Sequence, residues 1–152
     1  MSEQDCFLLI QMRVLVIYES TMGRTKKMAE TICEGVESAG PECRLVEASD
    51  FDGVVEECAV AIGSSTRMKK TLPRVRQILA ELPEVDGLPA AAFGSYGWSG
   101  EAPDIIAEHL KNSGAALIDE SPLKVKDHPY GRDLDSCREL GIALAKKCSP
   151  ES

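Results

Sequence analysis

Aromatic residues and histidines are scarce in this chain of 152 residues, and its basic residues are fewer than its acidic ones. Phe, Tyr and Trp together make up 5% of it, with a single Trp, and there are two histidines. Acidic residues outnumber basic ones by 25 to 17, which gives a formal net charge of −8. Nucleic-acid binding needs an excess of basic residues, so this balance argues against a nucleic-acid partner. It suits solubility alone or attraction to a basic partner surface.

Long apolar runs and metal-binding spacings are also missing. No run approaches the roughly 20 apolar residues that cross a bilayer. The N-terminal segment 7–10 is too short for a signal peptide and follows acidic residues. We therefore expect no membrane association and a cytoplasmic location. The six cysteines form no C-x-x-C pair, and neither they nor the histidines show the spacing of a zinc, iron–sulfur or diiron site, so no metal is expected.

The even number of cysteines leaves a disulfide framework open, although a chain of this length can bury enough core to fold without one. Cys33 and Cys137 fall on the apolar stripes of predicted helices, and Cys58 opens a predicted buried strand. We therefore expect most of the cysteines to be inert core thiols. Cys6 and Cys148, near the two ends, are the expected exposed thiols.

Strand and helix patterns alternate along the chain. Stripes of apolar residues at three-to-four spacing predict four helices. Five apolar runs predict strands, at 13–18, 44–48, 58–63, 88–93 and 115–118, the last with a candidate continuation at 123–125. This alternation predicts an α/β fold with a doubly wound five-stranded parallel sheet in the order 2-1-3-4-5. We expect one domain over 13–152, preceded by an N-terminal extension over 1–12.

Three polar loops follow the first, third and fourth predicted strands, whose carboxyl ends meet where ligands bind in this architecture. The first loop, 20–25, places hydroxyl residues and one glycine at the start of a helix, an arrangement that binds phosphate through free N–H groups. An ordinary helix cap at Ser20 or Thr21 is the alternative. The third loop, 94–100, combines three glycines with Tyr96 and Trp98, which favours binding of a planar ring.

The first loop resembles the flavodoxin phosphate loop, [Ser/Thr]-x-Thr-Gly-x-Thr. Ser20, Gly23 and Thr25 match it, while Met22 replaces the middle threonine. A methionine at this position is familiar from the flavodoxin-like domain of flavo-diiron proteins.

The third loop strengthens that particular resemblance. Residues 93–102, Phe-Gly-Ser-Tyr-Gly-Trp-Ser-Gly-Glu-Ala, are similar to the flavin loop of flavo-diiron proteins, and 122–126 and 137–141 also resemble that family. The resemblance covers about 13–147. The residues of a diiron domain are absent from the sequence, so no iron site is implied.

The resemblance implies a flavodoxin-like protein that binds FMN and transfers electrons to a redox protein partner, as a monomer or homodimer. No catalytic residue is expected, because the flavin supplies the chemistry. The implied cofactor-binding residues come from all three loops, and they are Ser20, Thr21, Met22, Gly23, Arg24, Thr25, Ser64, Ser65, Thr66, Arg67, Met68, Ser95, Tyr96, Gly97, Trp98, Ser99 and Gly100.

Two other functions stay open, an FMN-dependent NAD(P)H:quinone or flavin reductase and a flavin-free binding module. A receiver domain shares the strand order, but it needs clustered carboxylates after the first strand, where this chain has Tyr18-Glu19-Ser20. The second loop lacks glycine and contains Arg67, Lys69 and Lys70. We hypothesise that these cations favour the anionic reduced flavin; the alternative is that they are only solvated or cap the next helix.

Overall fold

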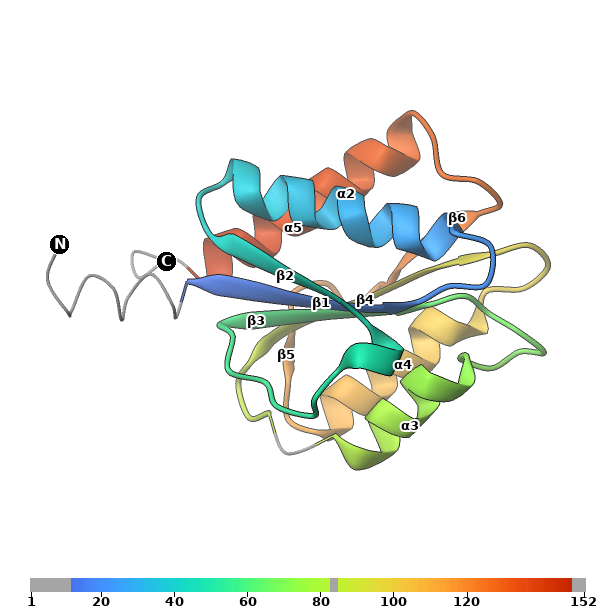
Figure 1. Ribbon diagram of the computed structural model, residues 1–152, viewed down its shortest axis with the longest axis horizontal. Coiled ribbons are helices and arrows are strands. Elements are labelled where there is room, and N and C mark those ends of the chain that lie inside the picture. Colours follow the sequence, from blue (N-terminus) through green and yellow to red (C-terminus); the bar gives the residue numbers. More distant parts are fainter. Residues whose placement is uncertain (1–11, 83–84, 149–152) are drawn as a thin grey trace, which may run out of the picture.

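The computed structural model describes residues 12–82 and 85–148, so nearly all of the predicted extension 1–12 lies outside the described residues. Strands alternate with helices as predicted (Figure 1). The elements in order are β1 (Arg13–Glu19), α2 (Arg24–Ser38), β2 (Glu42–Glu47), the 3₁₀ turn η1 (Ala48–Asp50), β3 (Ala59–Ser64), α3 (Pro73–Glu81), β4 (Pro89–Tyr96), α4 (Glu101–Asn112), β5 (Ala116–Leu117), β6 (Leu123–Lys126) and α5 (Arg132–Cys148).

The sheet has the order β2-β1-β3-β4-β5, which confirms the prediction, and β6 also pairs with β4. All of these pairings are parallel. The predicted fifth strand is therefore divided, with β5 beside the start of β4 and β6 beside its end. Pro122 lies in the interruption, where its missing N–H could not have joined the ladder. The division lets β6 end at the same sheet edge as β4.

The core lies on both faces of the sheet, and β1 supplies both halves. Val14, Val16 and Tyr18 pack under α2 and α5, whereas Leu15 and Ile17 pack under α3 and α4. Figure 1 shows these two helix pairs on opposite sides of the strands. A strand buried on both faces has no polar alternation, because successive side chains both point into protein.

Helices α2 and α5 cross closely over their face of the sheet. A Cβ atom added to Gly35 would overlap the backbone of Arg138, and one added to Gly141 would overlap the carbonyl oxygen of Ile32. The two glycines thus permit backbone-to-backbone contact between the helices. This contact sets α2, whose first turn faces the loops at the sheet edge, against the C-terminal helix.

The expectation that most cysteines are free core thiols is wrong. Cys33 of α2 is bonded to Cys43 of β2, and Cys58, just before β3, is bonded to Cys148 at the end of α5. Cys148 is therefore not the exposed thiol that we expected. The apolar stripe placed Cys33 correctly in the core, but a pairing depends on which elements lie side by side, and linear spacing does not contain that information.

Cys137 is the one cysteine within the described residues that remains a thiol. It is fully buried in the core on the α5 face of the sheet. Burial, with a smaller contribution from Asp133, raises its pKa to about 12, so the prediction of an inert core residue is confirmed for this cysteine. Cys6 lies outside the described residues.

Candidate functional site

The three polar loops meet at the carboxyl edge of the sheet and enclose a cleft of about 290 Å³. Every residue that lines it was among those predicted from the sequence: Thr21, Met22, Arg24, Ser65, Thr66, Ser95, Tyr96, Gly97 and Trp98. A second hollow of about 210 Å³ shares Thr66 and Trp98 with the first and adds Met68, Lys69 and Ser99. Together they reach the size of small-molecule sites in proteins, which begins at about 300 Å³.

The start of α2 borders the cleft. Gly23 occupies the position before the helix in the left-handed conformation, with φ 83, and offers no side-chain cap. Its own N–H donates to Ser20 Oγ at 3.0 Å, which fixes the turn. The first turn of this fully described helix contains no acidic residue. Uncapped N–H groups at the positive end of a 15-residue helix are suited to an anion.

Thr25 joins the three loops through its hydroxyl. Thr25 Oγ1 lies 2.7 Å from Ser95 Oγ and 3.0 Å from Ser65 Oγ, and it accepts a hydrogen bond from the Ser95 N–H at 3.3 Å. One donated and two accepted bonds use the full capacity of a hydroxyl. Thr25 is completely buried and does not line the cleft. Its side chain therefore positions the loops, while its backbone remains part of the helix start.

The second loop is a tight hairpin. Arg67 and Lys70 exchange backbone hydrogen bonds of 2.9 and 3.0 Å, and the two residues between them, Met68 and Lys69, have φ of 51 and 64. Left-handed conformations are unfavourable for such residues by about 1 kcal/mol each, so the turn holds them against their preference. The side chains of Met68 and Lys69 are exposed and line the second hollow.

Ser64, also predicted as a site residue, is fully buried below this hairpin. Its hydroxyl donates to the Ser65 carbonyl oxygen at 2.8 Å and accepts from the Leu72 N–H at 2.9 Å. Nearby, Glu19 Oε1 at the end of β1 accepts from the Val75 N–H of α3 at 2.9 Å. These contacts fix the start of α3 against the sheet and support the second loop from beneath.

The third loop presents its aromatic residues differently. Trp98 is 95% exposed and borders both hollows. Tyr96 is half-buried, and its ring lies so close to Gly100 that a Cβ there would come within 3.1 Å. The Ala102 N–H donates to Thr66 Oγ1 at 3.0 Å, which ties the second loop to the start of α4. Gly97 separates Tyr96 from Trp98 in the chain, and Ser99 and Gly100 follow Trp98.

Asp127, which was not among the residues predicted from the sequence, also belongs to this edge. Its N–H donates to the Tyr96 carbonyl oxygen at 2.7 Å, and its carboxylate lies 3.8 Å from Arg24 Nη1. The signal that could have found it is the candidate strand at 123–125, because a strand beside β4 must end next to the third loop.

Both histidines, His109 and His128, are exposed.

Residues 12–82 and 85–148 contain neither a metal-binding cluster nor a membrane-spanning helix. No group of three or more His, Cys, Asp or Glu side chains could hold a metal ion there. No helix in that part of the chain has the length and apolarity needed to cross a membrane.

Residues 16–141 match the family model described as Flavodoxin. The chain belongs to the flavodoxin family. FMN is the cofactor of this family. A flavodoxin from the domain Archaea shares 38% identity, with a TM-score of 0.82, and the match covers 90% of this chain and 98% of that one. The rubredoxin oxygen:oxidoreductase of Desulfovibrio gigas shares 27% identity, with a TM-score of 0.84, over 90% of this flavodoxin and 36% of that chain.

Among curated proteins, a nitric oxide reductase of Moorella thermoacetica is 34% identical over 143 residues, which are 89% of this flavodoxin and 36% of that protein. An anaerobic nitric oxide reductase flavorubredoxin of Vibrio vulnificus is 31% identical over 144 residues, 88% and 29% of the two chains. The flavodoxin therefore spans about a third of the length of these relatives.

The residues at the cleft fit FMN. Its phosphate needs an anion site, which the uncapped start of α2 and Arg24 can supply. Its ring needs flat apolar contacts, which Tyr96 and Trp98 of the same cleft can supply. Thr21, Ser65 and Thr66 also line the cleft, and their hydroxyls can bind polar groups of the ligand.

Proposed function

We propose that this flavodoxin binds FMN across its three loops and carries electrons between protein partners. The observation on which the proposal rests is the cleft that joins an uncapped helix start to two aromatic side chains. The flavin, when bound, supplies the capacity to accept and release electrons. The protein supplies an anion site, orientation of the ring, and access for a partner.

In this proposal the first loop anchors the phosphate. The left-handed turn at Gly23 aims the first N–H groups of α2 into the cleft. Arg24 borders the cleft and adds a positive charge, which Asp127 at 3.8 Å holds in place. Thr25 keeps this loop in register with the other two through its hydroxyl bonds.

The ring would lie between the hairpin and the third loop. Tyr96 is supported from behind by Gly100, whereas Trp98 is 95% exposed, so one side of the ring site is firm and the other opens to solvent. Neither hollow is lined by Asp, Glu, His or Cys within the described residues. Tyr96 and Lys69 are the residues of this lining that could transfer a proton, and a lining without carboxylate, imidazole or thiol groups suits electron transfer better than acid–base catalysis.

The test uses Trp98, since the only tryptophan of the chain borders both hollows. Purified protein should be yellow, and chromatography should identify the released flavin as FMN. Titrating FMN into flavin-free protein should quench the tryptophan fluorescence. Riboflavin, which lacks the phosphate, should bind much more weakly. Equal affinity for both would disprove the phosphate site, and no effect of either would disprove flavin binding.

A matched pair of variants sharpens this test. Arg24→Ala should weaken FMN about tenfold or more, the usual effect of losing a charge-assisted contact, and should leave riboflavin binding unchanged. Lys146→Ala, at the exposed end of α5, removes the same charge away from the cleft and should change neither. Rapid bleaching of the bound flavin by NADPH alone would favour the reductase function over the electron carrier.

The cytoplasmic location remains part of the proposal. It is supported by the family and by the absence of a spanning helix within the described residues. Two disulfides are unusual in cytoplasmic proteins outside hyperthermophiles. Trapping thiols in freshly broken cells, followed by mass spectrometry of the cysteine peptides, would show whether both bonds exist there.

A further inference from the structure

The charges of this acidic chain are segregated towards one edge. Four segments form the loop edge of the sheet, namely 20–27, 64–76, 94–101 and 122–128. They contain ten basic and two acidic residues, Glu101 and Asp127. Because the whole chain has 17 basic and 25 acidic residues, the remainder has seven basic and 23 acidic ones. The cleft therefore opens on a positive end of a negatively charged molecule.

Most of this positive charge has no ion-pair partner within residues 12–82 and 85–148. Lys124 is paired with Asp104, and Arg24 lies near Asp127. Eight other cations of these segments are exposed and have no ion pair within the described residues. Two of them, Arg74 and Arg76, belong to α3. We call the other six the basic rim: Lys26, Lys27, Arg67, Lys69, Lys70 and Lys126. Glu19, at the end of β1, is turned inward and accepts from the Val75 N–H.

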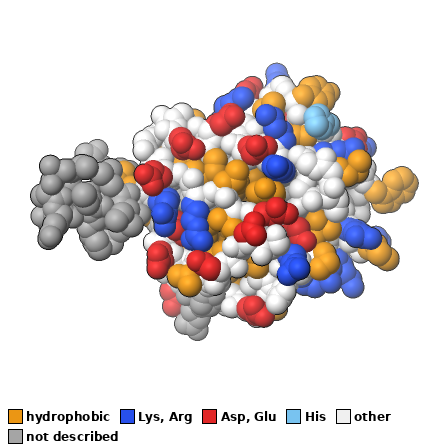
Figure 2. Space-filling view, in the orientation of Figure 1, with side chains coloured by type: hydrophobic (Ala, Val, Ile, Leu, Met, Phe, Trp, Pro, Cys, Tyr) orange, Lys and Arg blue, Asp and Glu red, His pale blue; other side chains and the backbone are white. Residues whose placement is uncertain are grey.

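Large apolar side chains are exposed at the same place. Met22 is 74% exposed, Met68 86% and Trp98 95%, and all three border the hollows. In Figure 2, Lys and Arg side chains lie beside hydrophobic ones at the end of the molecule where the loops after β1, β3 and β4 lie in Figure 1. An apolar centre with a charged margin is the usual composition of a protein interface, with methionine, tryptophan and arginine enriched.

We propose that the basic rim and these three apolar side chains form the docking surface for a small acidic redox protein. This inference rests on the proposed FMN site, which it places under the docked partner, and it reverses the expectation drawn from net charge alone. The overall charge of −8 repels an acidic partner from most of the surface, whereas the rim attracts it. The partner is thus steered to the one edge where the flavin is accessible.

The electron count of the transfer is simple. A one-electron donor is oxidised by one electron at each encounter, so two donor molecules reduce one FMN completely, and the protons come from solvent. The partner must therefore dissociate between encounters. A rim of exposed lysines suits this requirement, because exposed charge pairs raise association rates more than they slow dissociation.

The test measures flavin reduction by rapid mixing with two probes of opposite charge. A reduced acidic plant-type ferredoxin donates to the oxidised FMN-loaded protein, and the reduced FMN-loaded protein donates to basic cytochrome c. With ferredoxin, the rate should fall about tenfold between low salt and about 0.15 M, where charges are screened beyond about 8 Å. With cytochrome c the reaction should be slower at low salt.

Charge reversal identifies the surface. Lys70→Glu with Lys126→Glu changes two rim cations that line neither hollow, and it should slow the ferredoxin reaction about tenfold at low salt. Lys146→Glu with Lys147→Glu makes the same change in net charge at the exposed end of α5 and should alter that rate less than about twofold. The FMN affinity of both variants is measured in parallel.

The outcomes separate the two proposals. Loss of FMN binding in the wild type would overturn the proposed function itself. If FMN binds normally but the rate of reduction by ferredoxin changes neither with salt nor in the rim variant, only the docking surface would be overturned. Reduction by NADPH that the rim variant abolishes would assign the rim to a dinucleotide and would also overturn the proposal.

Discussion

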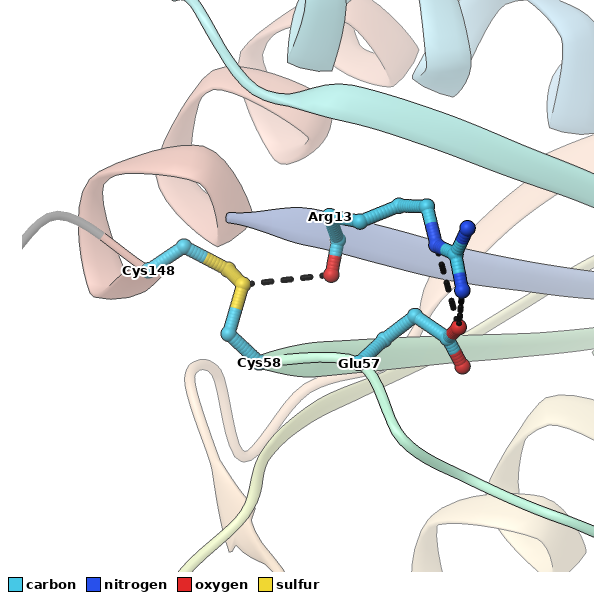
Figure 3. The surroundings of a disulfide bond; sticks show 4 residues. All are labelled: Arg13, Glu57, Cys58 and Cys148. Atoms are coloured by element: carbon cyan, nitrogen blue, oxygen red, sulfur yellow. Dashed lines mark hydrogen bonds and ion pairs between the residues drawn. A yellow bond between two sulfur atoms is a disulfide. The ribbon is translucent and has the colours of Figure 1, made fainter. Parts of the chain in front are cut away.

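The two edges of the sheet are built by different means. At the amino edge, a disulfide joins Cys58 to Cys148, and Arg13 Nη2 lies 2.7 Å from Oε2 of a Glu57 side chain that is 0% exposed (Figure 3). At the carboxyl edge, the loops are joined by hydroxyl hydrogen bonds centred on Thr25. Covalent and buried ionic links therefore hold one edge, whereas at the other edge the three loops are joined to one another through neutral hydrogen bonds of about 1 kcal/mol each.

The difference shows how a binding edge can be left open. Exposed loops with left-handed residues, such as Met68 and Lys69, contribute little to stability. Strong links at the opposite edge offset this, because they keep the ends of β1, β3 and α5 together. We therefore expect changes at the amino edge to alter stability without FMN affinity, and changes at the carboxyl edge to alter both.

Loss of the disulfide between Cys58 and Cys148 should have the largest effect. The bond closes a sequence separation of 90 residues, for which the chain-entropy relation gives about 4.6 kcal/mol. Cys148→Ser should therefore lower the free energy of unfolding in urea by about that amount while FMN affinity stays unchanged. Cys43→Ser is the comparison, since its bond closes only 10 residues and should matter less. Equal midpoints for Cys148→Ser and wild type would contradict the prediction.

Glu57→Gln should have the next largest effect. The carboxylate is bonded by Arg13 Nε at 3.1 Å and Nη2 at 2.7 Å, and Arg44 Nη1 lies 3.5 Å away. The amide keeps the shape but leaves Arg13 without its counter-charge and Arg44 with only Asp52, at 3.3 Å, which should cost about 3 kcal/mol in chemical unfolding. FMN titration should be unaffected. A loss of FMN affinity here would show that the edges are not independent.

Thr25→Val tests the carboxyl edge. The change keeps the volume but leaves Ser65, Ser95 and the Ser95 N–H without their shared partner. We expect about 2 kcal/mol less stability together with about tenfold weaker FMN binding, measured by tryptophan quenching. Thr25→Ser retains the hydroxyl and should recover most of both. If Thr25→Val lost stability alone, the hydroxyl would not position the FMN loops.

Asp52 should give the smallest effect, as a dependence on pH. The Val54 N–H, followed by attraction to Arg44, holds the pKa of this exposed carboxyl below its ordinary 3.8. The folded state thus binds the proton less readily than the unfolded chain. Its contribution is complete above pH 3.8 and is lost as the pH falls through the lower folded value. The free energy of unfolding of Asp52→Asn should differ from that of wild type at neutral pH, and this difference should shrink as the pH is lowered. A difference that stays constant with pH would refute this.

The strands, the loops and the open sheet order were all predictable from linear pattern. Cys58–Gly63 is a continuous small-apolar run, and its structure is the six-residue buried strand Ala59–Ser64. The divided fifth strand, and with it the place of Asp127 beside Tyr96, was only partly predictable, because pairing to β4 depends on register between distant segments. The left-handed hairpin at Met68 and Lys69 lacks the glycine or asparagine that would have signalled it.

The sequence by itself determined the layered architecture and the family of the protein, because hydrophobic period and loop chemistry are local properties that a linear reading preserves. The tertiary structure decided three other features: the disulfide pairs, the role of Thr25 as a connector, and the concentration at one edge of cations that are unpaired within the described residues. Each of these depends on residues far apart in the chain, from Thr25 to Ser95 and from Cys58 to Cys148. Only the folded sheet brings such residues within bonding distance or onto one surface.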